Sequence, residues 1–103
     1  MSGGAALLSD ADLYDEAAIR QVYHLYCDLI DQKDFARLDE VFTLDSVGDY
    51  RSANGKIQNG LAPLIEHLTR GMGPGSDCGP THHNVLNFRI RVDGDTATSR
   101  AHF

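Results

Sequence analysis

The segment from Tyr14 to Lys33 constrains this chain most, because its apolar residues recur at three- and four-residue spacing. This repeat predicts an α-helix with one buried face, made of Ile19, Val22, Tyr23, Tyr26, Leu29 and Ile30. Asp31 falls at the margin of that face and in the last turn, where the helix dipole disfavours a negative charge. A half-buried carboxylate there should have a raised pKa or a cationic partner. Asp31 is therefore either a partly solvated acid before a turn or one half of an acid–base pair.

Length and charge limit the class of protein. The chain has 103 residues, which is enough for one domain with one modest core. Its net charge is −6 and it has no basic stripe, so nucleic acid and anionic membranes are not expected partners. Its apolar runs are far shorter than a membrane span, and its first residues lack the features of a secretion signal. Because Cys27 and Cys78 have no disulfide or metal spacing, we expect no disulfide and a cytoplasmic location.

The rest of the chain is predicted to mix short helices with strands. The first helix should begin after Asp12 as its cap, and a second helix should follow Asp34 as its cap. The later elements, in order, are a strand at 47–51, a turn at 52–55, a brief strand at 56–59, a helix after Gly60, a glycine-rich loop at 71–80, a long strand at 81–92 and a returning strand at 96–103. We expect a flexible tail at 1–12 and one α+β domain at 13–103, with a sheet that looks incomplete at its C-terminal end.

Several short motifs follow one another along the chain. They are Val22-Tyr23, Leu29-Ile30-Asp31-Gln32-Lys33-Asp34-Phe35, Asp49-Tyr50-Arg51-Ser52, Gly79-Pro80-Thr81-His82-His83, Asn87, and Val92-Asp93-Gly94-Asp95-Thr96-Ala97. In order and spacing these motifs resemble the SnoaL-like and scytalone dehydratase branch of the nuclear transport factor 2-like superfamily. The resemblance implies a cone-shaped, curved mixed β-sheet with three helices around an apolar pocket. It also implies a homodimer or homotrimer that associates through the outer sheet surface.

The resemblance also implies a site. In the enzymes of this branch an Asp of the first helix pairs with a His of the long strand, and the matching residues here are Asp31 and His83. A Tyr matching Tyr50 helps to hold or polarise a substrate oxygen. Scytalone dehydratases have another Tyr immediately before the Asp, whereas this chain has Ile30, which argues against that particular substrate. Further candidates for contact with the substrate are Tyr26, Tyr23, His82 and Asn87.

Strand alternation leaves the choice of histidine open. Leu86, Phe88, Ile90 and Val92 share one face of the expected strand, and by strict alternation His82 shares that face while His83 does not. Either a β-bulge between Asn84 and Asn87 switches the faces, or His82 is the inward histidine. We favour His83, because its spacing to Asn87 agrees with the family. Adjacent strand histidines point to opposite sides and cannot easily share a metal ion, so we expect no metal site.

An Asp–His pair in an apolar pocket suits one class of chemistry. A neutral imidazole can take and return a proton near pH 7, and a neighbouring carboxylate stabilises the imidazolium that forms. Together with the resemblance, this chemistry implies a lyase or isomerase, dehydratase- or dehydrochlorinase-like, that needs no cofactor and acts on a small apolar cyclic molecule. The alternative is a non-catalytic member of the fold that binds a hydrophobic ligand or a protein partner, because fold does not fix function.

Overall fold

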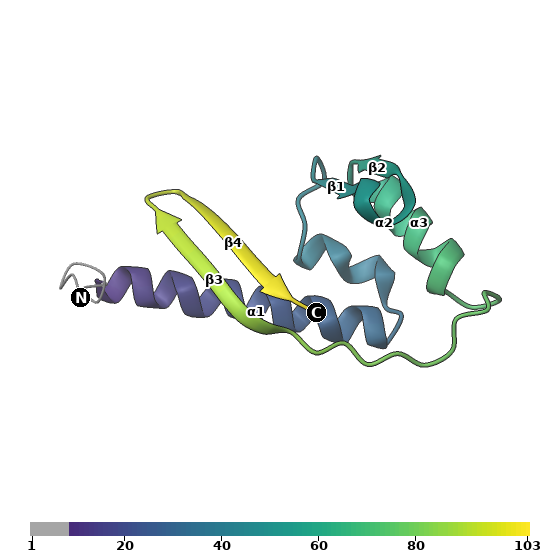
Figure 1. The fold of residues 1–103 in the computed structure, drawn as a ribbon, viewed down its shortest axis with the longest axis horizontal. Coiled ribbons are helices and arrows are strands. Elements are labelled where there is room, and N and C mark those ends of the chain that lie inside the picture. Colours follow the sequence, from purple (N-terminus) through teal and green to yellow (C-terminus); the bar gives the residue numbers. More distant parts are fainter. Residues whose placement is uncertain (1–8) are drawn as a thin grey trace. The chain divides into compact units, whose positions relative to one another are not determined.

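The computed structural model describes residues 9–103, and Figure 1 shows their path. The elements, in chain order, are helix α1 (Asp10–Asp31), the 3₁₀ helix η2 (Phe35–Glu40), strand β1 (Val47–Tyr50), the short helix α2 (Arg51–Asn54), strand β2 (Lys56–Asn59), helix α3 (Leu61–Met72) and strands β3 (Leu86–Asp93) and β4 (Thr96–His102). Contacts within the chain divide these elements into two compact units. One unit holds residues 25–83, and the other holds 9–24 together with 84–103.

Helix α1 begins earlier than the sequence predicted. Asp10 is its first residue, and the backbone N–H of Asp12 donates to the hydroxyl oxygen of Ser9 over 3.1 Å. Ser9 therefore caps the helix, as serine commonly does, and the prediction of Asp12 as the cap was wrong. Of the expected tail at 1–12, residues 1–8 lie outside the described residues, and residues 10–12 are helical.

The fully buried face of α1 is confined to its second half. Leu29 and Ile30 are each 1% exposed, whereas Val22 is 41% exposed. Leu29 and Ile30 belong to the core of the unit at 25–83, where residues of η2 and α3 cover them. The predicted apolar face is therefore correct next to Asp31 and wrong at Val22.

The end of α1 fixes the position of Asp31. The backbone N–H of Asp34 donates to the carbonyl of Leu29 over 2.9 Å, and that of Lys33 donates to the carbonyl of Ile30 over 3.0 Å. These two bonds form a Schellman motif, which ends a helix with one residue in the left-handed conformation. Lys33 takes that conformation with φ of 58°. The break predicted at 32–34 is thus confirmed, although glycine, the usual residue for it, is absent.

The core of the unit at 25–83 is small and wholly apolar. Its buried side chains are Leu29, Ile30, Phe35, Leu38, Leu61, Leu64 and Leu68. The second predicted helix is the 3₁₀ helix η2, whose six residues make it longer than most 3₁₀ runs. Asp34 precedes it without a capping hydrogen bond from its side chain, and its carboxylate lies 3.6 Å from the guanidinium of Arg37 instead.

Strands β1 and β2 form an antiparallel pair in which Tyr50 lies opposite Lys56. The predicted strand at 56–59 is confirmed, and the strand predicted at 47–51 ends at Tyr50. Arg51 leaves the strand because the carboxylate of Asp49 accepts its backbone N–H over 3.1 Å and its guanidinium over 2.7 Å. The expected turn is the single helical turn α2, closed by Gly55 at φ of 77°.

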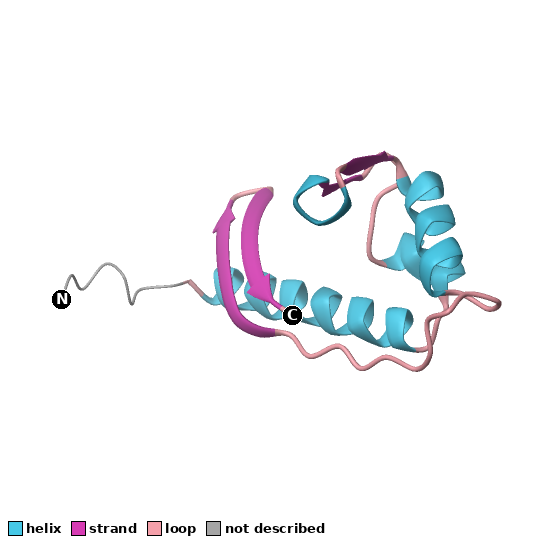
Figure 2. Cartoon of the chain, turned by 45° about the vertical axis from the view of Figure 1, so that its right-hand side comes forward, coloured by secondary structure: helices cyan, strands magenta, loops and turns pink. Residues whose placement is uncertain are grey.

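The other unit joins the first half of α1 to the hairpin of β3 and β4, and both views show the hairpin lying across that half of the helix (Figures 1 and 2). The ring of Phe88 packs edge-on against Tyr23 with centroids 5.3 Å apart, and the guanidinium of Arg20 lies 5.0 Å from the same ring. The hydroxyl groups of Tyr23 and Ser99 are hydrogen-bonded at 2.7 Å.

Strand β3 is shorter than predicted. It begins at Leu86, so residues 81–85 lie outside it and the strand predicted from residue 81 was wrong there. A β-bulge is present, but it lies between Leu86 and Arg89 rather than between Asn84 and Asn87. Asn87 is its left-handed residue, with φ of 56°, a conformation that asparagine tolerates better than most residues.

The architecture is α+β, as the sequence predicted. Within residues 9–103 the strands form two separate antiparallel pairs, so the single mixed sheet that was expected is not present there. No helix in the described part of the chain has the length and apolar character that crossing a membrane would require. Cys27 and Cys78 are both free thiols in this structure.

Candidate active site

Asp31 is the centre of a hydrogen-bonded cluster at the end of α1. One of its oxygens, Oδ1, lies 2.6 Å from Nδ1 of His83 and accepts the hydroxyl of Thr81 over 2.8 Å. The other oxygen, Oδ2, accepts the backbone N–H of His83 over 2.8 Å. The side chains of Asp31 and His83 are 20% and 29% exposed, so the pair is sheltered but reachable. The predicted contact between these two residues is therefore confirmed.

These bonds determine the charge of Asp31 and the tautomer of His83. Hydrogen bonds from the side chain and backbone of His83, and then from Thr81, lower the pKa of Asp31 to about 2. The raised pKa that was one of two expectations for Asp31 is therefore wrong. An ionised carboxylate can only accept hydrogen bonds, so Nδ1 of His83 carries the hydrogen. In the neutral imidazole this leaves Nε2 with a free lone pair, which is the form of a general base.

The segment that carries His83 is attached to the end of α1 by a second set of contacts. The ammonium group of Lys33 donates to the backbone carbonyl of Met72 over 2.5 Å and lies 3.9 Å from the thiol sulfur of Cys78. Lys33 follows Asp31 by two residues, and its left-handed backbone places its side chain at the start of the glycine-rich loop. The loop is tied at Met72 and Cys78 before it reaches Thr81 and His83.

Tyr50 lies in the same unit, at the junction of β1 and α2. Its ring is stacked in a tilted manner on His67 of α3, with centroids 5.7 Å apart. A Cβ atom on Gly48 would lie only 2.8 Å from the Tyr50 ring, so the absence of a side chain at Gly48 makes room for it. Burial raises the pKa of Tyr50, which keeps its phenol protonated and able to donate.

Tyr26 is a second protonated phenol in this unit. Burial, followed by repulsion from Tyr50 and Cys27, raises the pKa of Tyr26 to about 12. Its ring packs edge-on against Phe42, with centroids 5.8 Å apart. The unit at 25–83 therefore holds an ionised carboxylate, an accessible imidazole and two phenol donors.

Comparison with known proteins agrees with these observations. A family profile described as SnoaL-like domain matches residues 11–103. The chain belongs to the SnoaL-like domain family. Through this family it belongs to the nuclear transport factor 2-like superfamily. No solved structure gave a significant match.

Three curated proteins are similar to this chain over most of its length. One uncharacterized protein of Mycobacterium bovis and two of Mycobacterium tuberculosis are each 38% identical over 96 residues. The alignment covers 92% of this chain but only 62% of each relative, so the chain spans less than two thirds of the length of these proteins.

The remaining predicted site residues of this SnoaL-like domain have other surroundings in the structure. His82 is exposed, so of the two neighbouring histidines it is His83 that reaches Asp31. Tyr23 and Asn87 belong to the unit with the β3–β4 hairpin, where Tyr23 packs against Phe88 and Asn87 is an exposed bulge residue. Their proposed contact with a substrate stays a prediction.

Two residues at the site were missed by sequence reasoning. Thr81 was read as part of a long strand, although it stands in the quoted family motif two residues before His83. His67 belongs to none of the quoted motifs, yet it is only partly exposed and lies against Tyr50. Within residues 9–103 no group of three or more His, Cys, Asp or Glu side chains is arranged to hold a metal ion.

Proposed function

We propose that this SnoaL-like domain belongs to a cofactor-independent lyase or isomerase, a dehydratase-like enzyme that acts on a small apolar cyclic molecule. The observation that carries the proposal is the 2.6 Å contact between Asp31 Oδ1 and His83 Nδ1, which involves Nδ1 of the imidazole and not Nε2. The family includes enzymes of this kind.

In the proposed reaction His83 acts first as a base and then as an acid. Nε2 takes a proton from a carbon next to a carbonyl group, and the C–H electron pair forms a new C=C bond as the neighbouring C–O bond breaks. The imidazolium then returns its proton to the leaving oxygen, which departs as water, so atoms and charge balance. Asp31 stabilises the imidazolium between these steps, because it is ionised and hydrogen-bonded to Nδ1.

Tyr50 and Tyr26 are proposed to contact the substrate oxygen. Both have raised pKa values and therefore remain donors at neutral pH. A donor aimed at the carbonyl oxygen stabilises the negative charge that develops there as the proton leaves. Tyr50 is the stronger candidate, because its ring packs against the ring of His67 and occupies the space that a side chain at Gly48 would fill.

The test is a set of single substitutions in the full-length protein, after an active substrate has been found among cyclic hydroxy-ketones and halogenated rings. His83→Ala should lower kcat by roughly 10²–10⁴-fold, because it removes the proton-transfer group. Asp31→Asn should also be severe, since it removes the charge beside the imidazolium. Tyr50→Phe should cost less, because it deletes one donor and keeps the ring.

His82→Ala is the matched control, since it removes the exposed neighbouring imidazole, and it should have a much smaller effect. Circular dichroism should show that each variant is folded. Wild-type turnover by folded His83→Ala would contradict the mechanism. Saturable binding of these compounds without turnover by the wild type would favour the non-catalytic alternative.

A further inference from the structure

The β3–β4 hairpin has a concentrated positive face in a chain whose net charge is −6. Arg89 lies directly opposite Arg100, and Arg91 lies directly opposite Thr98. Residues two apart on a strand share a face, so these two neighbouring cross-strand pairs lie on the same side of the hairpin. Three guanidinium groups and one hydroxyl thus occupy four adjoining positions, which we call the arginine face.

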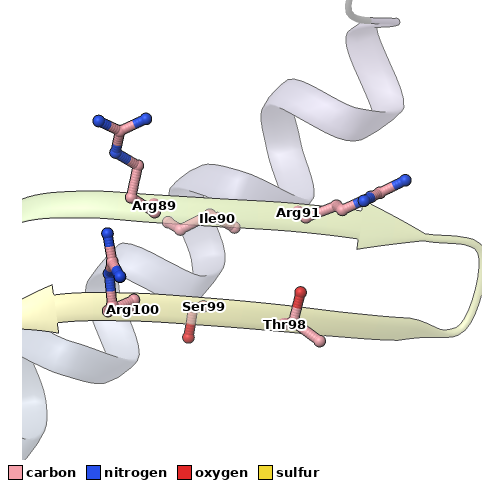
Figure 3. A pocket seen from close by; sticks show the side chains of 6 residues that line it. All are labelled: Arg89, Ile90, Arg91, Thr98, Ser99 and Arg100. Atoms are coloured by element: carbon pink, nitrogen blue, oxygen red, sulfur yellow. The ribbon is translucent and has the colours of Figure 1, made fainter.

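The arginine face is turned away from the packed side of the hairpin. Phe88 and Ser99 contact Tyr23 of α1, so their side defines the inner face. Figure 3 shows Arg89 and Arg100 rising together from their two strands, with Ser99 pointing the opposite way. The two strands border a shallow hollow, which is lined by Arg89, Ile90, Arg91, Thr98, Ser99 and Arg100.

These charges have no salt-bridge partner in the part of the chain that the structure describes. Within residues 9–103 none of the three arginines forms an ion pair, whereas Arg20, Arg37, Arg51 and Arg70 each pair with an acid. Asp93 is the nearest acid along the same strand face, but it lies beyond Arg91 at the turn and makes no ion pair with it. Like charges directly opposite each other destabilise a strand pair. A bound anion would remove that repulsion.

We propose that the arginine face binds the phosphoryl group of a small phosphorylated molecule. Guanidinium groups bind phosphate oxygens through pairs of parallel hydrogen bonds, and the Thr98 hydroxyl offers one further donor. The overall negative charge of the chain repels long polyanions, so a compact dianion fits this face better than nucleic acid or an anionic membrane does. This proposal does not rest on the proposed Asp31–His83 chemistry.

Inorganic pyrophosphate is a suitable probe, titrated into the full-length protein by calorimetry at constant ionic strength. We expect saturable binding that Arg100→Gln and Arg89→Gln each weaken by about tenfold or more, as expected for the loss of a charge-assisted hydrogen-bond pair. Lys56→Gln is the matched control, because it removes one positive charge from the exposed edge of β2. It should leave the affinity within about twofold if the site is local.

A second readout does not require binding. Without added anions, Arg100→Gln should melt at the same temperature as the wild type or higher, because the opposed charges are gone, and pyrophosphate should raise the melting temperature of the wild type more than that of this variant. Absence of saturable binding, or equal weakening by Lys56→Gln, would overturn the proposal. Tighter binding to phosphatidic acid vesicles or to RNA than to pyrophosphate would overturn the assignment to a small molecule.

Discussion

Asp31 holds three hydrogen bonds in its ionised form, and this makes its contribution to stability depend on pH. The folded state lowers its pKa from an ordinary value of 3.8 to about 2, chiefly through His83. A carboxyl group with a lowered folded pKa binds protons more readily when the chain is unfolded. Its stabilising effect is therefore fully present well above pH 3.8 and is lost as the pH falls toward 2.

The corresponding prediction compares wild type with Asp31→Asn in urea unfolding between pH 6 and pH 2. The wild type should be more stable at pH 6, and the difference should shrink as the pH falls through the window from about 4 to 2. The stability of the variant is subtracted from that of the wild type because other acids also make stability depend on pH. Pairing with Arg37 lowers the pKa of Glu40, and pairing with Arg51 lowers the pKa of Asp49. A difference that is constant over the whole range would contradict the ionised, hydrogen-bonded role of Asp31.

At this scale the sequence predicted the partner of Asp31 but not the way in which it is held. The helical repeat and the family motif together pointed to His83. Strand alternation favoured His82 instead, because it assumed that the strand begins at residue 81. In the structure residues 81–85 are outside the strand, so alternation does not apply to them. The Thr81 hydroxyl and the His83 backbone N–H reach Asp31 for this reason, and no periodic pattern could reveal it.

At the scale of elements, the join between α3 and the glycine-rich loop is tightly packed. Gly73 is buried and caps the end of α3, where its backbone N–H donates to the carbonyl of Thr69. A Cβ atom on Gly73 would lie 2.4 Å from the Thr69 carbonyl oxygen, which is backbone and cannot rotate away. Gly71, by contrast, lies within the last turn of α3 with open space around its Cα.

We predict that Gly73→Ala destabilises the protein by about 1–3 kcal/mol, as forced overpacking commonly does. Gly71→Ala, two residues away, is the matched variant and should stabilise by about 0.5–1 kcal/mol, because alanine restricts the unfolded chain and favours the helix. Urea unfolding of both variants measures the two effects. Equal effects of the same sign would show that the close approach at Gly73 does not govern the end of α3.

The elements themselves were predictable where one residue type decides the local conformation. Gly55, Gly60 and Gly94 mark breaks that sequence reasoning located correctly, and all three have positive φ. Lys33 and Asn87 also have positive φ, at the end of α1 and in the bulge of β3. Their side chains do not demand this conformation, which belongs to the Schellman motif at Lys33 and to the β-bulge at Asn87. The bulge was consequently placed a few residues too early, and strand β3 was predicted too long.

At the scale of the whole molecule, this chain covers only part of what its relatives contain, since the alignment spans 62% of their length. Its surface includes exposed apolar side chains on helix α1. Leu13 and Tyr14 of α1 are 51% and 79% exposed and border a shallow hollow with Ala17. Clustered exposed apolar side chains are typical of surfaces that become covered by another part of a protein.

We predict that the full-length protein is a homodimer or homotrimer and that Leu13 contributes to its association. Sedimentation velocity over a wide concentration range should show the oligomer for the wild type and a shift toward monomer for Leu13→Glu, because a charge at a buried apolar contact is costly. Ser52→Glu is the control, since it adds the same charge at an exposed position of α2. If the wild type sediments as a monomer at every concentration, the oligomer is ruled out. If both variants remain oligomeric, Leu13 lies outside the interface and the association must use another surface.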